Sequence, residues 1–524
     1  MAKRFLTCSL EQPYLLPPSP HDWLPESDLA RVMAEVVGEL DLSAILNEYG
    51  RKDGRGKAAY HPEMMVRLLL YAYCTGVASS RKIEEATYIN VAYRYLAANQ
   101  HPDHDTIATF RKEHLKALAD LFIQGLRLCQ EAGLVKLGHV ALDGTKVKAN
   151  ASRHRSVSYE RLSEQEKHWQ QTVAELLAKA EKTDVAEDEQ FGKGKKEETL
   201  PEELAKAEKR LAAIRAAKAA LEQRAQTKLE EVSQAAPPPR PRGRPKKGTG
   251  PSAAEKTAAE KHRKQRNRAR QEAEQPTSTY NFTDPDSRLM VDGATKAFVQ
   301  AYNAQAAVDD QAQIIVAASV TQEVNDRNQL APLVAEMQQN VGAFPTVASA
   351  DTGYWDTASI ESIHQQQPQT SLLAPPEATR NSEIPANAPQ NDTAQAMRER
   401  LKTAEGKAEY KRRAATVEPV FGQIKQARNF RQFSLRGVTA VAAEWQLVCL
   451  AHNLLKLARH RRAQTSPFSV PPGTRRRSPG YSSTRQPAFF VPGVHRNALG
   501  RQNRRRHVRP AIFCRPASTN AFVD

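Results

Sequence analysis

The chain has 524 residues, 76 Lys and Arg against 59 Asp and Glu, and a formal net charge of +17. This length is enough for several domains. No run of about 18 apolar residues predicts a membrane-spanning helix, and the first residues lack the apolar stretch of a signal peptide. We therefore expect a cytoplasmic protein. No two of the five cysteines have C-x-x-C spacing, so the sequence indicates neither a zinc knuckle nor a disulfide framework; they are Cys8, Cys74, Cys129, Cys449 and Cys514.

Positive charge is concentrated at the C-terminal end of the chain. Residues 461–524 contain 13 Arg and one acidic residue, Asp524, which gives them +12 of the total +17. Such an excess suggests a polyanionic partner, but the rest of the chain is only weakly basic. We expect the Arg- and Pro-rich tail to be disordered.

The N-terminal part predicts a flexible segment followed by helices. Residues 1–25 are rich in Pro, and residues 26–135 carry apolar side chains at helical spacing. Several short helices with basic residues between them suit a helix-turn-helix-like DNA binder, and they suit any small helical bundle equally well. His101 and His104 form the tightest histidine group, but we interpret this stretch as a loop ending in an Asp that caps a helix beginning near Thr106.

Residues 136–151 predict a strand, and residues 152–278 interrupt the pattern. In the interruption, apolar residues recur with the spacing of a coiled-coil seam, in which Lys218 takes one polar position; the others are Leu204, Ala207, Leu211, Ile214 and Leu221. We expect a helical hairpin, then a basic helix near 255–273. Arg242 and Arg244, in Arg-Gly-Arg-Pro, suit either an A·T minor-groove contact or a solvated linker.

Residues 279–460 predict alternating strands and helices. Strand patterns occur within 288–320, at Thr346–Ala350 and near 371–374, and an amphipathic helix is expected over Asp326–Gln339. Helices then fill about 403–460. This order predicts an α/β domain in which a mixed sheet is flanked by helices, with residues 136–151 contributing its first strand.

Two carboxylates follow predicted buried strands, and the number of residues between them suits two acids on one sheet. Asp143 ends one apolar run and Asp351 ends another, 208 residues later; 127 of these belong to 152–278, which leaves 81. That is about the span of two strands, a helix and a fourth strand, so the two acids would share one edge of a sheet. Oxygen ligands of this kind favour Mg²⁺ or Mn²⁺. Alone, each Asp would equally suit a turn.

A third acid, Glu418, is predicted in the first turn of a short helix. Thr416 would cap this helix, and Pro419 is tolerated in a first turn. The positive end of the helix dipole would favour the ionised carboxylate. Lys425 lies seven residues further on, and we expect it on the same face, about 10 Å along the axis.

Tyr410, Arg413, Glu418 and Lys425 resemble the Y-R-E-K signature of DDE transposases of bacterial insertion sequences, and the chain is most similar to insertion-sequence family 1182. Four residues separate Arg413 from Glu418, where the signature has three. The resemblance implies an RNase H-like catalytic domain, split after its first strand by the helical insertion 152–278. It also implies that Asp143, with Asp351 and Glu418, holds two Mg²⁺ or Mn²⁺ ions.

The activity implied by the resemblance is DNA transposition. Such an enzyme binds the ends of an insertion sequence, cuts phosphodiesters and joins a 3′-OH to target DNA, with Tyr410, Arg413 and Lys425 positioning phosphates. Its partners would be double-stranded DNA and a second copy of the chain in a synaptic complex, and it would associate with the nucleoid. An inactive DNA-binding remnant and a metal-dependent nuclease are the alternatives. Trp355 and Trp445 suit core packing better than stacking on a displaced base.

Overall fold

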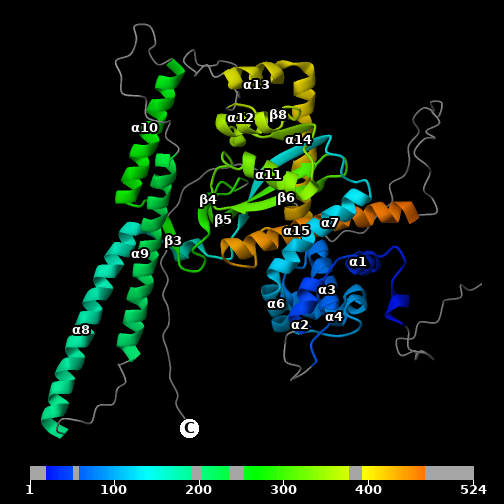
Figure 1. Ribbon diagram of the computed structural model, residues 1–524. Helices are drawn as coiled ribbons and strands as arrows, with labels where there is room; N and C mark the ends of the chain where they lie inside the picture. The colour runs from blue at the N-terminus through cyan, green and yellow to red at the C-terminus, as the bar shows by residue number, and fades with distance from the viewer. Residues whose placement is uncertain are drawn as a thin grey trace, which may run out of the picture. The chain divides into compact units, whose positions relative to one another are not determined.

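A computed structural model (Figure 1) describes residues 19–50, 58–191, 202–234, 253–293, 295–376 and 392–465. Residues 1–469 form one compact unit and 470–524 a second, so every described residue belongs to the first unit. The Arg-Gly-Arg-Pro stretch with Arg242 and Arg244 and the tail beyond Thr465 lie outside the described residues.

A mixed sheet forms the centre of the α/β part. Its order is β4-β5-β1-β7-β8, with β6 also paired to β5. Strands β1 and β5 are antiparallel, as are β5 and its partners β4 and β6, whereas β7 runs parallel to β1 and β8 parallel to β7. The bounds are β1 His139–Lys148, β4 Arg288–Val291, β5 Phe298–Asp309, β6 Ile314–Thr321, β7 Val347–Ala350 and β8 Ser371–Leu373. This topology is compatible with the expected RNase H-like domain.

Helices connect the parallel strands because a parallel pair cannot be joined by a tight turn. Helix α11 (Leu330–Val341) lies between β6 and β7, and α12 (Thr357–Gln366) lies between β7 and β8. Helix α11 begins four residues after the predicted start at Asp326, which instead belongs to the loop that follows β6. All four residues of β7 are buried, as expected for a strand whose two faces are covered.

The N-terminal part is helical, as predicted. Its helices are η1 Pro20–Trp23, α1 Leu29–Gly38, α2 Ser43–Gly50, α3 Pro62–Thr75, α4 Ser80–Ile89, α5 Val91–Leu96, α6 His104–Glu113 and α7 Leu115–Glu131. An Asp caps α6 as expected, because the Asp103 carboxylate accepts a hydrogen bond from the Thr106 amide at 2.7 Å, but the helix begins at His104, two residues before the expected start. The predicted flexible segment 1–25 includes the short helix η1.

The longest apolar helix, α15 (Val438–Thr465), connects the N-terminal helices to the sheet. By length and composition it could cross a membrane, but 67% of its most apolar window is buried inside the fold. Its neighbours include α7, α3 and β6 (Figure 1). Trp445 is fully buried and donates a hydrogen bond to the Gln305 carbonyl at 2.9 Å, so core packing is confirmed for this indole. Residues 461–465, which we placed in the disordered tail, are helical.

Three long helices lie between β1 and β4 in the sequence. They are α8 (Tyr159–Phe191), α9 (Glu202–Gln234) and α10 (Ala253–Glu274), with η2 (Arg153–Arg155) and β2 (Ser156–Ser158) before them and β3 (Thr279–Asn281) after them. Strand β2 pairs antiparallel with β3, so the two ends of the helical segment lie side by side.

Helices α8 and α9 pack along most of the predicted seam. Leu204, Ile214 and Leu221 are buried. Lys218 is wrong as a seam residue: Ala217 takes the buried position, and the Lys218 ammonium contacts the Glu166 carboxylate at 3.1 Å. The seam therefore continues without a polar break, because a spacing of three residues after Ile214 keeps the apolar side chain inward.

Candidate functional site

Asp143 and Asp351 lie where the parallel pairing of β1 and β7 stops. The last pair in that ladder is Leu142 with Ala350, and each acid is the next residue along its strand. The position of Asp143 differs from the prediction, because β1 continues for five residues beyond it and Asp143 pairs with Ala306 of β5. Both carboxylates thus belong to the same edge of the β1–β7 ladder, as the sequence predicted.

The Asp143 carboxylate is held in a largely buried position. Its Oδ1 accepts a hydrogen bond from the Gly144 amide at 2.8 Å, and its Oδ2 lies 3.4 Å from Nη1 of Arg413. Burial raises the pKa of Asp143 to about 6, Arg413 opposes the shift, and the charge of Asp351 adds to it. Near neutral pH this site therefore concentrates negative charge that a cation can stabilise.

Asp351 is fixed by the turn that follows β7. The chain enters the short helix η3 (Thr352–Tyr354), and the Asp351 Oδ1 accepts a hydrogen bond from the Gly353 amide at 2.8 Å. Tyr354 is fully buried, and its hydroxyl donates to Gln305 of β5. This contact anchors the turn to the sheet beneath the carboxylates.

The helix that carries Glu418 differs from the predicted one. Helix α14 spans Ala404–Gly422, so Glu418 lies near its C-terminal end and not in its first turn. Thr416 does not cap a helix; its hydroxyl donates to the Arg412 carbonyl at 2.8 Å. Pro419 is inside the helix. The expected stabilisation of Glu418 by the positive end of the helix dipole is therefore wrong.

A long-range contact explains how Pro419 fits inside α14. Proline lacks the amide hydrogen that would bond the carbonyl of Ala415, one turn earlier. The side chain of Gln313 donates to that carbonyl at 3.2 Å in its place. Because Gln313 belongs to the turn between β5 and β6, no local pattern around Pro419 could predict this contact.

Arg413 joins the helix to the sheet. Its guanidinium contacts Asp143 at 3.4 Å and Glu418 at 3.9 Å, and its side chain is 14% exposed. Glu418 is 61% exposed. A residue five positions along a helix is rotated by about 140°, against about 40° for a residue four positions along. The additional residue between Arg413 and Glu418 therefore turns the Glu418 carboxylate partly away from the arginine that contacts Asp143.

Tyr410 and Lys425 both approach this region. The ring of Tyr410 lies under the Arg413 guanidinium, 5.8 Å from ring centre to the guanidinium carbon. Lys425 is in a π-helical turn, η4 (Gln423–Ala427), and donates to the Lys146 carbonyl at 2.7 Å. The α-helix ends at Gly422, so the expected common helical face of Glu418 and Lys425 is not maintained. Whether these side chains bind DNA phosphates stays a prediction.

One acid beside the predicted pair was missed from the sequence. Asp326 accepts hydrogen bonds from Asn303 at 2.6 Å and Gln305 at 2.8 Å, and its charge contributes to the raised pKa of Asp143. Lys146 lies 3.8 Å from it. We had interpreted Asp326 as the start of a helix. Only the pairing of β5 with β1 brings its partners to the site: Lys146 pairs with Asn303 and Gly144 with Gln305, on the face of the sheet opposite to that of Asp143.

Other acids serve structural contacts. Asp284 is fully buried and accepts hydrogen bonds from the Tyr302 hydroxyl at 2.9 and 3.0 Å, and Asp286 accepts from the Val438 amide at 3.1 Å. Asp309 accepts from the Leu137 amide at 2.7 Å. These bonds tie the three acids to the backbone and to a buried tyrosine, and they give the acids structural roles.

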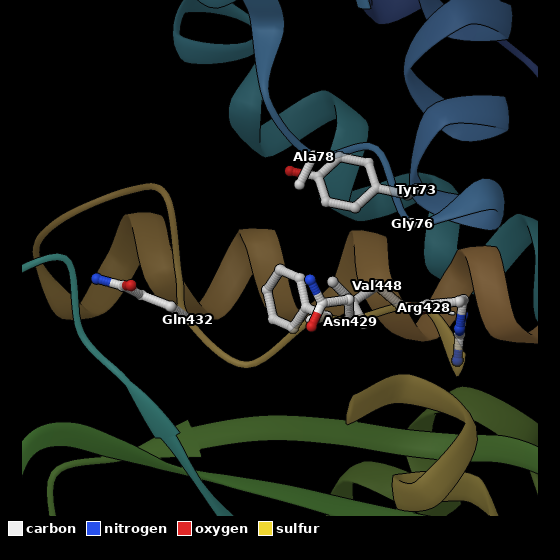
Figure 2. Close-up of a pocket in the computed structure, with 8 residues that line it drawn as sticks. Tyr73, Gly76, Ala78, Arg428, Asn429, Gln432 and Val448 are labelled. Atoms are coloured by element: carbon white, nitrogen blue, oxygen red, sulfur yellow. Dashed lines mark hydrogen bonds between the residues drawn. The ribbon is translucent and has the colours of Figure 1, made fainter. Parts of the chain in front are cut away.

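A small pocket lies elsewhere, between the N-terminal helices and the loop after η4. Figure 2 shows Tyr73, Gly76 and Ala78 on one side, and Val448 of α15 together with Arg428, Asn429 and Gln432 on the other. The full lining is Tyr73, Gly76, Ala78, Arg428, Asn429, Phe430, Gln432 and Val448. None of the carboxylates of the candidate centre lines it, so this pocket is not the site of the chemistry that the acids suggest.

Comparisons with known proteins match two parts of the chain. Residues 375–458 match a family described as "Transposase DDE domain", and this range contains Glu418. Residues 18–113, in the N-terminal helices, match "Transposase domain (DUF772)". The chain is thus similar to transposases over these two ranges, and the matches support a DDE transposase of insertion sequences. Comparisons with curated proteins and with solved structures gave no match.

DDE transposases generally use divalent metal ions, and the carboxylates of this chain fit such ions in part. Asp143 and Asp351 supply the hard oxygen ligands that such ions prefer, and the raised pKa of Asp143 marks a carboxylate short of stabilising positive charge. Among the described residues, however, no group of three or more His, Cys, Asp or Glu side chains is close enough to share one ion. The two strand acids fit a cation, and Glu418 is connected to Asp143 only through Arg413, which contacts both carboxylates.

Proposed function

We propose that this transposase binds the ends of an insertion sequence, cleaves DNA phosphodiesters and joins the freed 3′-OH to target DNA. One observation carries the proposal: Asp143 and Asp351 are adjacent at the end of the β1–β7 ladder, and Arg413 links this pair to Glu418. This arrangement places two carboxylates side by side and connects a third to them through one guanidinium, although the three come from distant parts of the sequence.

In this proposal Asp143, Asp351 and Glu418 hold Mg²⁺ or Mn²⁺. Two bound ions supply Lewis acidity to the attacking and leaving oxygens of the phosphodiester. Arg413 neutralises Asp143 and Glu418 in the free protein and keeps their carboxylates near each other. Tyr410, Arg413 and Lys425 position DNA phosphates, which orients the strand without reading its sequence.

We also propose a division of labour along the chain. Residues 26–135 recognise the element ends, in line with the match of residues 18–113 to a transposase domain. Residues 136–151 and 279–460 form the RNase H-like catalytic domain, residues 152–278 are an insertion in it, and residues 461–524 are a basic tail. The active species is a homodimer in a synaptic complex, working in the cytoplasm at the nucleoid, and the protein belongs to the branch with the Y-R-E-K signature.

The test is cleavage and joining with purified protein. DNA carrying the two ends of the encoding element is incubated with the protein, target plasmid and Mg²⁺, and the products are resolved on sequencing gels. Asp143→Asn, Asp351→Asn and Glu418→Gln should each abolish cleavage, because an amide keeps the shape but not the charge that binds a cation. Binding to DNA should remain close to that of the wild type.

Glu361→Gln is the matched control. Glu361 is an exposed acid of α12 whose carboxylate accepts a hydrogen bond from Thr393, outside the candidate centre, and its variant should cleave normally. Near-normal cleavage by one of the three site variants would remove that residue from the centre. Cleavage without joining by the wild type would replace the proposal with a metal-dependent nuclease, and DNA binding without cleavage would indicate an inactive remnant.

A further inference from the structure

Asp326 occupies a position in the candidate centre that the family signature does not account for. It lies in the loop between β6 and α11, and its Oδ1 accepts hydrogen bonds from Asn303 at 2.6 Å and Gln305 at 2.8 Å. These two amides are two residues apart on β5, so both project from the same face of the sheet. Two donors from a rigid strand fix the carboxylate, although the residue itself belongs to a loop.

Two glycines show how close Asp326 lies to the predicted acids. A Cβ on Gly144 would lie 2.6 Å from the Asp326 Oδ1, and a Cβ on Gly353 would lie 3.6 Å from its Oδ2 and 3.0 Å from Oδ1 of Asp351. Gly144 and Gly353 directly follow, or nearly follow, Asp143 and Asp351. The Asp326 carboxylate therefore lies between the strand backbone that follows Asp143 and the turn that follows Asp351.

Lys146 is the positive partner of Asp326. Its Nζ lies 3.8 Å from the Asp326 Oδ1, and each of the two side chains is 19% exposed. Burial lowers the pKa of Lys146, while Asp326, followed by Asp351 and Asp143, acts in the opposite direction. The backbone of Lys146 is also fixed, because its carbonyl accepts a hydrogen bond from Lys425. A half-buried ammonium is thus kept beside three carboxylates.

An unpaired acceptor marks the same place independently. Asn303 is fully buried, and its Oδ1 has no hydrogen-bond partner among the described residues. This oxygen lies 3.1 Å from where a Cβ on Gly144 would be. Buried polar atoms are rarely left unpaired, so this unsatisfied oxygen distinguishes the crowded place beside Asp326 from the rest of the sheet.

We propose that Asp326 is a positioning residue that holds the Lys146 ammonium beside Asp143 and Asp351, where Lys146 contacts the phosphate of the DNA strand brought to these acids. The inference rests on the proposed function, since it takes DNA as the substrate. Without Asp326, the lysine would be free to pair directly with Asp143 or Asp351 and would compete with the cation there. Asp326 thus separates the phosphate-binding charge from the cation-binding charges.

The experiment is a double-mutant cycle read by DNA affinity. Binding of the full chain to a fluorescein-labelled duplex of random sequence is measured at several salt concentrations, without divalent cation, for Lys146→Met, Asp326→Asn and the double variant. Each single variant should weaken binding by about tenfold and reduce the salt slope by about 1, as for one lost phosphate contact. The double variant should be no weaker than either single variant, because both changes remove the same contact.

Lys148→Met is the matched control. Lys148 is exposed and lies two residues further along the same face of β1, but no contact links it to Asp326. Its effect on affinity should add to that of Asp326→Asn. Losses that also add for Lys146→Met and Asp326→Asn would overturn the proposal. So would unchanged DNA binding by Asp326→Asn together with a changed Mn²⁺ requirement for cleavage, since that result would make Asp326 a cation ligand.

Two further measurements cover the cases in which Asp326→Asn does not fold or the wild type does not bind DNA. If Asp326→Asn does not fold, as judged by circular dichroism, Lys146→Arg should retain the salt slope that Lys146→Met loses, and an unchanged slope for Lys146→Met would overturn the proposal. A failure of the proposed function gives a different result from a failure of this inference. A wild-type protein that does not bind the duplex at all contradicts DNA as the substrate, before any variant is compared.

Discussion

The candidate centre has a sheet side, which carries Asp143 and Asp351, and a helix side, which carries Glu418. The fold fixes the carboxylates of the sheet side more firmly than that of the helix side. Asp143 lies in a ten-residue strand paired on both edges, and Asp351 follows a fully buried strand. Glu418 is 61% exposed, and Arg413 contacts its carboxylate at 3.9 Å. Strand pairing fixes the first two carboxylates before any ligand arrives, whereas the third depends on one guanidinium. In the proposed function, it is therefore the binding of substrate or cation that brings Glu418 into its final position.

The largest expected difference between the two sides is in cation binding without DNA. Asp143→Asn and Asp351→Asn should abolish Mn²⁺ binding, because they remove ligands that are already in place. Glu418→Gln should leave it nearly unchanged, since Glu418 is not gathered with the other acids. Mn²⁺ titration followed by electron paramagnetic resonance measures this. Equal loss in all three variants would show that the helix side is as preorganised as the sheet side.

The pH dependence of stability should reveal the cost of the buried Asp143. Its pKa is about 6 in the folded protein against 3.8 ordinarily, so the folded state binds more protons between these values. Stability then falls as pH rises from 3.8 through 6, and above that range the charge costs about 3 kcal/mol. Asp143→Asn should remove this cost.

Thermal melts without divalent cation measure this effect. The melting temperature of Asp143→Asn should exceed that of the wild type at pH 7.5, and the gain should shrink as pH is lowered towards 4. Glu418→Gln is the comparison from the helix side and should show no such gain. A variant Asp143→Asn that is less stable at pH 7.5 would mean that the contact with Arg413 outweighs burial.

The two glycines beside the strand acids should respond unequally. In Gly144→Ala the new Cβ would lie 2.5 Å from the Gln305 amide and 2.6 Å from Asp326, so these side chains must move. In Gly353→Ala the nearest contact is 3.0 Å, to the Asp351 carboxylate. We expect Gly144→Ala to destabilise by about 1–3 kcal/mol and Gly353→Ala by less. Urea unfolding of both variants checks the order, and the reverse order would contradict the packing around Asp326.

The smallest effect is expected from removing helices α8–α10. Leu162, Ile214 and Leu221 form a cluster of their own, packed against Val157 and Tyr280 of the β2–β3 pair. Ser158 pairs directly with Thr279, so an Asn-Gly turn can join these two residues as a tight hairpin. The shortened protein should stay folded, with circular dichroism showing a loss of helix only. An insoluble or unfolded product would make the helices part of the core.

Sequence patterns predicted the sheet side better than the helix side. The apolar runs that end in Asp143 and Asp351 predict buried strands from local residues alone. Thr416 and Pro419 have the pattern of a helix start. The helix nevertheless continues through Pro419, where Gln313, about a hundred residues away, donates to the carbonyl that Pro419 leaves free. Asp326 was missed for the same reason, since the loop that carries it meets Asn303 and Gln305 only after β6 has paired with β5, and it meets Gly144 and Lys146 only after β5 has paired with β1.

The position of α15 between the N-terminal helices and the sheet determines how the molecule unfolds. This helix packs against α3 and α7 of the N-terminal part and against β6 of the sheet, and Gly125 of α7 leaves just enough room for Leu450. An element buried between two regions cannot open without exposing both. Hydrogen exchange in α15 should therefore occur only through global unfolding, so the helices matched to a transposase domain and the carboxylate-bearing sheet should lose their structure in one cooperative transition.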